Sequence, residues 1–125
     1  RYPGIVIGHI NWKGFLVLSV REISASELHG YLQTTDTNPL LLDVREPWEY
    51  EKCSLENSQL IPMRQIPSAL NELDPDQEII VICHHGIRSR SVAAYLVSNT
   101  FSKITNLTGG IDAWAKTVDP TMTTY

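Results

Sequence analysis

The chain has 125 residues, a length typical of one domain and sufficient to bury a core without disulfide staples. Its composition, 42% hydrophobic and 19% charged, is that of an ordinary globular domain. A formal net charge of −4 argues against a nucleic-acid-binding surface, because such surfaces are usually basic. The two cysteines, Cys53 and Cys83, are too few for a disulfide framework, so we expect reduced thiols and a cytoplasmic location.

The first 18 residues contain two apolar runs that are separated and interrupted by polar residues and glycines. They are too short and too polar to cross a membrane, so we expect no membrane partner. They also lack the basic start and the small-residue cleavage site of a signal peptide. We predict an N-terminal extension over residues 1–18, formed by two short strands with a turn near residues 11–14, and a main domain over residues 19–125.

The next segments predict a helix, a strand and a second helix in that order. Ser24 and Glu27 have the spacing of a capping box and should open a helix that runs to about Gln33. Residues 40–44 are a continuous apolar run broken only by Asp43, as in a strand that is buried on both faces. Pro47 suits the first turn of a short helix, and residues 60–62 form a brief strand candidate.

The second half of the chain continues this alternation of strands and helices. A helix is predicted over residues 66–73, with Ile66, Leu70 and Leu73 on one face. Predicted strands at residues 79–82 and 104–107 flank a helix that reaches about Asn99 and carries Val92, Tyr95 and Leu96 at helical spacing. A glycine pair then precedes a final helix over residues 111–118. The fold predicted is α/β, with a central, mostly parallel sheet flanked by helices on both faces.

The six residues from Cys83 to Arg88, C-H-H-G-I-R, follow directly on the strand predicted at residues 79–82. Ligands in parallel α/β folds bind at the carboxyl ends of strands, which is where this cysteine lies. The following helix points its free N–H groups back at the loop, and Gly86 allows a tight turn in which successive N–H groups converge. Nearby positive charge is expected from four side chains: His84, His85, Arg88 and Arg90.

The sequence around Cys83 contains no acidic residue between Glu78 and Asp112, although the protein as a whole is acidic. We therefore expect a locally positive site that attracts anionic substrates and favours the thiolate, which is the nucleophilic form. The alternative is that Cys83 is simply a small apolar residue at the end of a buried strand. Arg90 is expected to be a solvated charge, and Cys53 is interpreted as structural or incidental.

Metal binding is the other chemistry that a Cys-His-His sequence suggests. Two adjacent histidines are expected to point in different directions, and the remaining cysteine and histidines are scattered along the chain. We therefore predict no metal and no cofactor.

Three stretches together resemble the single-domain rhodaneses, a family of sulfurtransferases. Residues 41–50 (LLDVREPWEY) match the first signature of the family, residues 83–89 (CHHGIRS) match its active-site loop, and residues 106–114 (NLTGGIDAW) match its closing signature. The resemblance covers residues from about 20 to 118, and the tail from Val118 to Tyr125 is similar to tails of some bacterial single-domain members. It also resembles rhodanese domains that are fused to adenylyltransferases.

The resemblance implies covalent catalysis through Cys83. The Cys83 thiolate would take the outer sulfur of thiosulfate or another sulfane donor, forming a persulfide, and a thiophilic acceptor would then remove that sulfur. The backbone N–H groups of a substrate-binding loop would hold the negative charge; this loop comprises His84, His85, Gly86, Ile87, Arg88 and Ser89. Arg88 would meet the sulfonate oxygens of the donor, and Gly86 would keep the floor of the ring open. Asp43 would be structural, with Arg45 as a candidate partner.

One stretch departs from the family pattern, and several alternatives stay open. Residues 53–58 (CSLENS) replace the usual Gly-His-Ile-Pro-Gly-Ala, which changes the turn chemistry there. A cysteine phosphatase uses the same thiolate and arginine, but its loop has five residues between them where this chain has four. A non-catalytic interaction module is a further alternative. A protein sulfur donor or acceptor is a further candidate partner beside the small donor.

Overall fold

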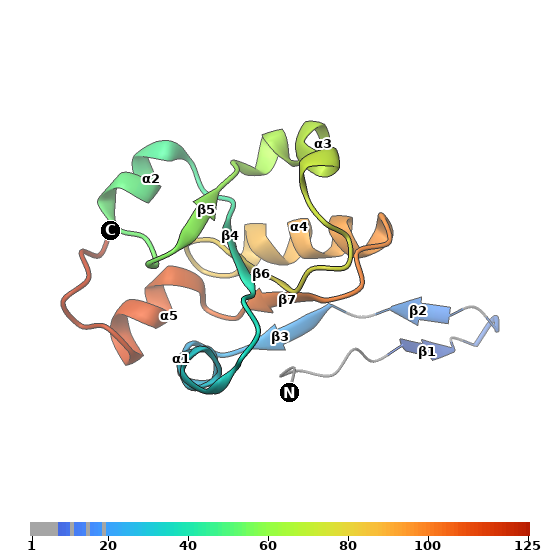
Figure 1. Ribbon diagram of the computed structural model, residues 1–125, viewed down its shortest axis with the longest axis horizontal. Helices are drawn as coiled ribbons and strands as arrows, with labels where there is room; N and C mark the ends of the chain where they lie inside the picture. Colours follow the sequence, from blue (N-terminus) through green and yellow to red (C-terminus); the bar gives the residue numbers. More distant parts are fainter. Residues whose placement is uncertain (1–7, 11, 15, 19) are drawn as a thin grey trace.

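The computed structural model describes residues 8–10, 12–14, 16–18 and 20–125. A five-stranded sheet in the order β3-β7-β6-β4-β5 forms the centre of the domain, and all of its strand pairs are parallel (Figure 1). The strands are β3 (Arg21–Ile23), β4 (Leu40–Asp43), β5 (Ser58–Leu60), β6 (Ile79–Ile82) and β7 (Ile104–Leu107). The predicted α/β fold with a parallel sheet is confirmed.

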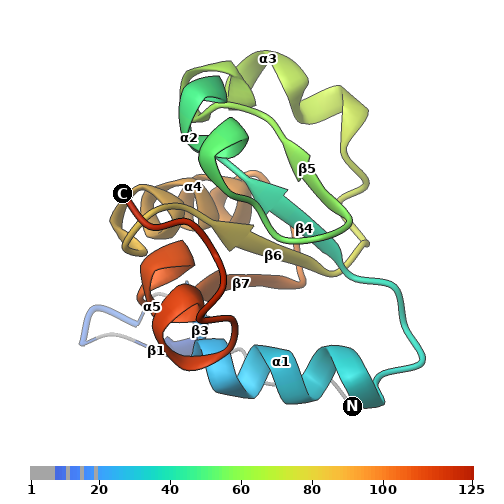
Figure 2. The same ribbon diagram turned by 90° about the vertical axis from the view of Figure 1, so that its left-hand side faces the viewer.

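Helices cover both faces of this sheet, because the central strands bury side chains on both sides. Helices α3 (Ile66–Ala69) and α4 (Ile87–Ser98) pack on one face, against a core that includes Leu42 and Val81. Helices α1 (Ala25–Thr34) and α5 (Gly110–Thr117) pack on the other, where Leu41 and Ile80 point (Figure 2). Helix α2 (Pro47–Lys52) follows β4 directly.

The order of the strands reverses between β4 and β6. From β4 the chain goes on to the edge strand β5, whereas from β6 it goes on to β7 on the opposite side. Asp43 at the end of β4 pairs in register with Ile82 at the end of β6, so Cys83 emerges at this reversal. In open α/β sheets the crevice at such a point is the usual binding site.

Local signals placed most elements correctly. Ser24 accepts a hydrogen bond from the backbone N–H of Glu27 at 3.1 Å, and the Glu27 carboxylate accepts one from Ser24 N–H at 2.9 Å. This reciprocal capping box opens α1 as predicted. The predicted strand at residues 60–62 is shifted toward the N-terminus, to Ser58–Leu60, and Tyr95 on α4 is 38% exposed.

The single helix predicted over residues 66–73 is wrong. The structure has a short 3₁₀ turn (η1, Met63–Gln65), one α-helical turn (α3) and a second 3₁₀ turn (η2, Leu70–Glu72). Pro67 lies in the first turn of α3, where it is tolerated, and the chain becomes extended at Leu73 shortly before Pro75. Ile66 and Leu73 are nevertheless buried, so the apolar face was identified correctly.

The N-terminal segment contains strands β1 (Gly8–Ile10) and β2 (Leu16–Leu18), which pair antiparallel as a hairpin. Residues 12–14 form its turn, whereas residues 1–7, 11, 15 and 19 lie outside the described part of the chain. The boundary at residue 18 stays a prediction. None of the helices in the described residues is long and apolar enough to span a membrane.

Two glycines offer a matched test of how tightly the active-site loop is packed. A Cβ on Gly110 would lie 2.4 Å from the Cys83 carbonyl oxygen and 2.5 Å from that of His84, at a φ of +59°. Gly110→Ala should therefore lower the free energy of unfolding by roughly 2–4 kcal/mol in urea denaturation. Gly30 lies within α1 with nothing within 4 Å of its Cβ position, so Gly30→Ala should raise stability by about 0.5–1 kcal/mol. Equal effects of the two changes would contradict this packing.

Candidate active site

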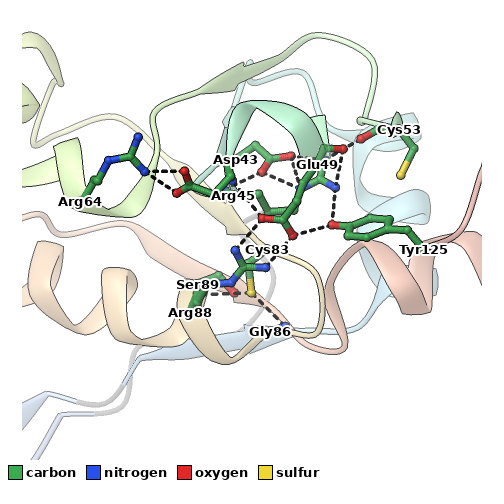
Figure 3. Close-up of polar contacts among 11 residues, drawn as sticks. Asp43, Arg45, Glu49, Cys53, Arg64, Cys83, Gly86, Arg88, Ser89 and Tyr125 are labelled. Atoms are coloured by element: carbon green, nitrogen blue, oxygen red, sulfur yellow. Dashed lines mark hydrogen bonds and ion pairs between the residues drawn. The ribbon is translucent and has the colours of Figure 1, made fainter. Parts of the chain in front are cut away.

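The sulfur of Cys83 lies inside a ring of backbone that opens α4. Its Sγ accepts hydrogen bonds from the N–H groups of Gly86 at 3.1 Å and Ser89 at 3.3 Å (Figure 3). Gly86 has a φ of +94°, the left-handed conformation that turns these N–H groups inward. Cys83 is only 1% exposed, whereas Ile87 at the outer edge of the ring is 72% exposed. The loop therefore holds a buried sulfur against donors suited to a negative charge.

The floor of the ring is held by residues of β7 and α5. Asn106 is fully buried, and its amide N–H donates to the Gly86 carbonyl at 3.2 Å while its Oδ1 accepts from the Ser89 hydroxyl. At the start of α5, the N–H of Ile111 donates to the Cys83 carbonyl at 2.9 Å. Asp112 N–H donates likewise to His84 at 3.0 Å. Residues 106–114, the closing signature of the family resemblance, therefore support the Cys83 loop.

Above the ring, Arg88 is held by a carboxylate from α2. Its Nη1 and Nη2 donate to Glu49 Oε1 at 2.7 Å and Oε2 at 2.8 Å, in a bidentate ion pair (Figure 3). The Arg88 side chain is 37% exposed, whereas that of Glu49 is 4% exposed. The Glu49 carboxylate also accepts from the backbone N–H of Glu46 and from the hydroxyl of Tyr125.

A buried cation behind this pair ties α2 to the end of β4. Arg45 is fully buried and donates through Nε and Nη2 to the Asp43 carboxylate, at 2.9 and 2.8 Å. It also donates to the carbonyls of Glu49 and Cys53 and to the Tyr125 hydroxyl. The predicted structural role of Asp43 and its pairing with Arg45 agree with this geometry. Cys53 contributes its backbone oxygen.

The charge states of this network follow from its contacts. Hydrogen bonds from Arg88 lower the pKa of Glu49 to about 2, so the carboxylate is ionised at neutral pH. Burial raises the pKa of Tyr125 to about 12, so its hydroxyl keeps the proton that it donates to Glu49. Burial, helped by the charge of His85, lowers the pKa of His84, which favours a neutral imidazole.

The two histidines do not point in different directions, so that expectation is wrong. Their rings stack with centroids 3.9 Å apart, and the ring of Tyr125 stacks on the other face of His84, also at 3.9 Å. Packing by Tyr125 explains the arrangement, because it closes the side to which His84 could turn. His84, His85 and Asp112 place potential metal-ligand atoms within 4.8 Å of one another. The planes of the two stacked rings are inclined by only 29°, so their in-plane lone pairs converge poorly on one ion, and the loop without a metal stays our prediction.

The expectation of a locally positive site is wrong, because the fold brings carboxylates to the arginines around Cys83. Residues without a nearby acid in the sequence meet acids from distant segments in space: Arg88 pairs with Glu49, and Arg90 pairs with Glu22 at 2.9 Å. Arg90 is therefore ion-paired as well as solvated. Each of these arginines is balanced by a carboxylate that lies 39 or 68 positions away in the sequence.

Sequence reasoning missed Glu49, Asn106 and Tyr125 as members of the site. Glu49 and Asn106 lie within the two signature stretches at residues 41–50 and 106–114, which was the available signal for them. Tyr125 lies in a tail whose only signal was a general family likeness. The C-terminus lies beside α2 in both views of the fold (Figures 1 and 2).

Comparison with known proteins agrees with this architecture. Residues 24–117 match the rhodanese-like domain family. The chain is 38% identical over 112 residues to a rhodanese-like/PpiC domain-containing chloroplastic protein of Arabidopsis thaliana, covering 85% of this chain but only 38% of that protein. It is 34% identical over 97 residues to a sulfurtransferase of Allochromatium vinosum, covering 78% of this chain and 90% of the relative.

A solved structure shows the same fold. The rhodanese-like domain protein of Staphylococcus aureus superposes with a TM-score of 0.70 at 32% identity, covering 74% of this chain and 89% of that one. The family match spans most of the chain and includes the Cys83 loop, the Glu49 helix and the Asn106 support. The chain therefore belongs to the rhodanese-like domain family.

Proposed function

We propose that the protein is a sulfurtransferase that carries a sulfane sulfur on Cys83 as a persulfide. The observation that carries the proposal is the position of Cys83 Sγ, which accepts hydrogen bonds from the N–H groups of Gly86 and Ser89 at the start of α4. These donors can stabilise negative charge on the sulfur during transfer, when the attacking sulfur and then the persulfide are anionic. The Allochromatium relative, which aligns over nearly its whole length, is named a sulfurtransferase.

The two half-reactions balance without an oxidant or a reductant. The Cys83 thiolate attacks the outer sulfur of a donor such as thiosulfate, an S–S bond forms, and the donor's own sulfur–sulfur bond breaks. Sulfite leaves with that electron pair, and the charge remains on the outer sulfur of the Cys83 persulfide. A thiophilic acceptor, a thiol or cyanide, then attacks the outer sulfur, and the electron pair of the persulfide bond returns to Cys83 as thiolate.

Different groups around the loop can contact different parts of a donor or an acceptor. Arg88 is the exposed guanidinium at the ring and can meet the oxyanion end of a donor while it keeps its contact with Glu49. Exposed Ile87 and Trp48, at 72% and 56%, offer apolar surface on the loop and on the neighbouring α2. A protein donor or acceptor could use that surface, so the partner class includes proteins as well as thiosulfate. A cytoplasmic location, where both thiols stay reduced, belongs to the same proposal.

The geometry does not favour the phosphatase alternative. Four residues separate Cys83 from Arg88, which closes a smaller ring than the five-residue phosphate loop. The interaction-module alternative predicts no covalent chemistry at Cys83, so a measurement of sulfur loading on Cys83 distinguishes it from the proposed function.

Incubation of the reduced protein with thiosulfate should add one sulfur atom to Cys83, seen as a mass gain by intact-mass spectrometry and located by peptide mapping. Cyanide should remove it. Cys83→Ser should abolish the gain and leave the circular dichroism spectrum unchanged, whereas the matched variant Cys53→Ser should load sulfur as the wild type does. Sulfur on the Cys83→Ser protein, or none on a folded wild type with thiosulfate or a persulfide donor, would contradict the proposal.

Arg88→Ala should slow persulfide formation from thiosulfate by roughly 10- to 100-fold, because a charged contact to the donor is lost and Glu49 is left uncompensated. Rapid quenching followed by mass spectrometry measures this rate. The control is Arg90→Ala on the same helix. Because the ion pair of Arg90 with Glu22 is exposed, this change should alter the rate of persulfide formation by no more than about twofold. Equal rates for Arg88→Ala and wild type would remove Arg88 from the donor site.

A further inference from the structure

The charge of Arg88 is already neutralised before any donor arrives. Glu49 receives four hydrogen bonds, from both terminal nitrogens of Arg88, the N–H of Glu46 and the hydroxyl of Tyr125. Its side chain is 4% exposed, so water does not compete for these contacts. A carboxylate held in this way cannot turn aside to release the whole guanidinium to a donor.

The neighbouring cations are balanced in the same way. Arg45 faces the Asp43 carboxylate in a pair that is fully buried. Arg90 faces Glu22, which also accepts from the side chains of Asn106 and Thr108. His84 is held between His85 and Tyr125 in a setting that favours its neutral form. The stabilisation of negative charge at the sulfur therefore comes from backbone N–H groups, which act over a short range.

We infer that Glu49 is a specificity-determining residue, and that the charge-balanced Arg88–Glu49 pair makes the site select sulfane donors with one negative charge over dianions such as thiosulfate. The inference rests on the proposed sulfur transfer. A monoanion places its charge on the reacting sulfur, where Gly86 and Ser89 meet it. A dianion brings a second charge to the Arg88–Glu49 pair, whose net charge is zero. Thiosulfonates and persulfides are the donor classes that fit.

Two donors that share the same reacting sulfur but differ in net charge test the inference. Methanethiosulfonate has the same reacting sulfur as thiosulfate but carries a methyl group in place of one oxygen, and it has one negative charge fewer. It reacts with the Cys83 thiolate to give the same persulfide, with methanesulfinate as the leaving group. The ratio of the two loading rates, thiosulfate over methanethiosulfonate, reports how the site treats the second charge.

Glu49→Gln keeps the shape of the side chain and one oxygen acceptor for Arg88 but removes the charge. It should raise the thiosulfate to methanethiosulfonate ratio by roughly tenfold. The matched control is Glu46→Gln at the N-cap of α2, whose exposed carboxylate pairs with Arg64; this change should leave the ratio within about twofold of the wild type. An unchanged ratio in a folded Glu49→Gln protein would overturn the inference, because a purely structural role of Glu49 would slow both donors alike.

An alkylation assay tests the same charge without sulfur transfer. Iodoacetate is an anion and iodoacetamide is neutral, and both modify thiolates at rates that peptide mass spectrometry can follow at Cys83. Glu49→Gln should raise the iodoacetate to iodoacetamide ratio at Cys83 several-fold, with the ratio at Cys53 as internal reference. If none of thiosulfate, methanethiosulfonate and a persulfide donor loads the wild type, the proposed function fails, whereas the alkylation ratio still decides whether Glu49 sets the charge at the site.

The salt dependence of the wild type keeps the inference testable if Glu49→Gln does not fold. A net positive site attracts a dianion more than a monoanion, so added salt would slow thiosulfate loading more than methanethiosulfonate loading. A charge-balanced site leaves the repulsion between thiolate and dianion uncompensated, so salt should speed thiosulfate loading or leave it unchanged. Steep slowing of thiosulfate loading alone would overturn the inference.

Discussion

The site depends on a guanidinium that never reaches the solvent. Arg45 is fully buried and gathers the Asp43 carboxylate, the carbonyls of Glu49 and Cys53, and the Tyr125 hydroxyl. Removing a charge from water costs several kcal/mol, which only a complete set of partners offsets. Because those partners belong to β4, α2 and the C-terminal segment, satisfying Arg45 fixes three parts of the chain together. The place of α2 at the mouth of the loop, and with it the reach of Glu49 to Arg88, follows from that requirement.

The loop itself is fixed from the opposite side by groups without a net charge. Asn106 supports the carbonyl of Gly86 and receives the hydroxyl of Ser89, while the first N–H groups of α5 take up the carbonyls of Cys83 and His84. With these carbonyls paired to β7 and α5, the loop is held in the conformation in which the N–H groups of Gly86 and Ser89 face the sulfur. The geometry around Cys83 is therefore a consequence of where β7 and α5 meet.

Features that depend on neighbours in sequence could be predicted, and features that depend on distant segments could not. The capping box of α1 spans three positions and the Asp43–Arg45 pair spans two, so both were visible in the sequence. The place of Cys83 followed from the alternation of strands and helices. The Glu49–Arg88 pair joins residues 39 positions apart, and Tyr125 meets Glu49 across 76 positions. Counting acids along the sequence around Cys83 predicted a positive site because it could not include these carboxylates.

That correction changes how the site handles an anion. Side-chain cations act over distances of several ångströms and would draw in any negatively charged donor, whereas aligned N–H groups act at the atom they contact. With Arg88 balanced by Glu49 and Arg90 balanced by Glu22, the ring stabilises charge mainly on the sulfur that sits within it. Such a site distinguishes where on a donor the charge lies, and not merely how much charge the donor carries. The persulfide that we propose on Cys83 carries its single charge on the terminal sulfur, and this arrangement suits such a charge.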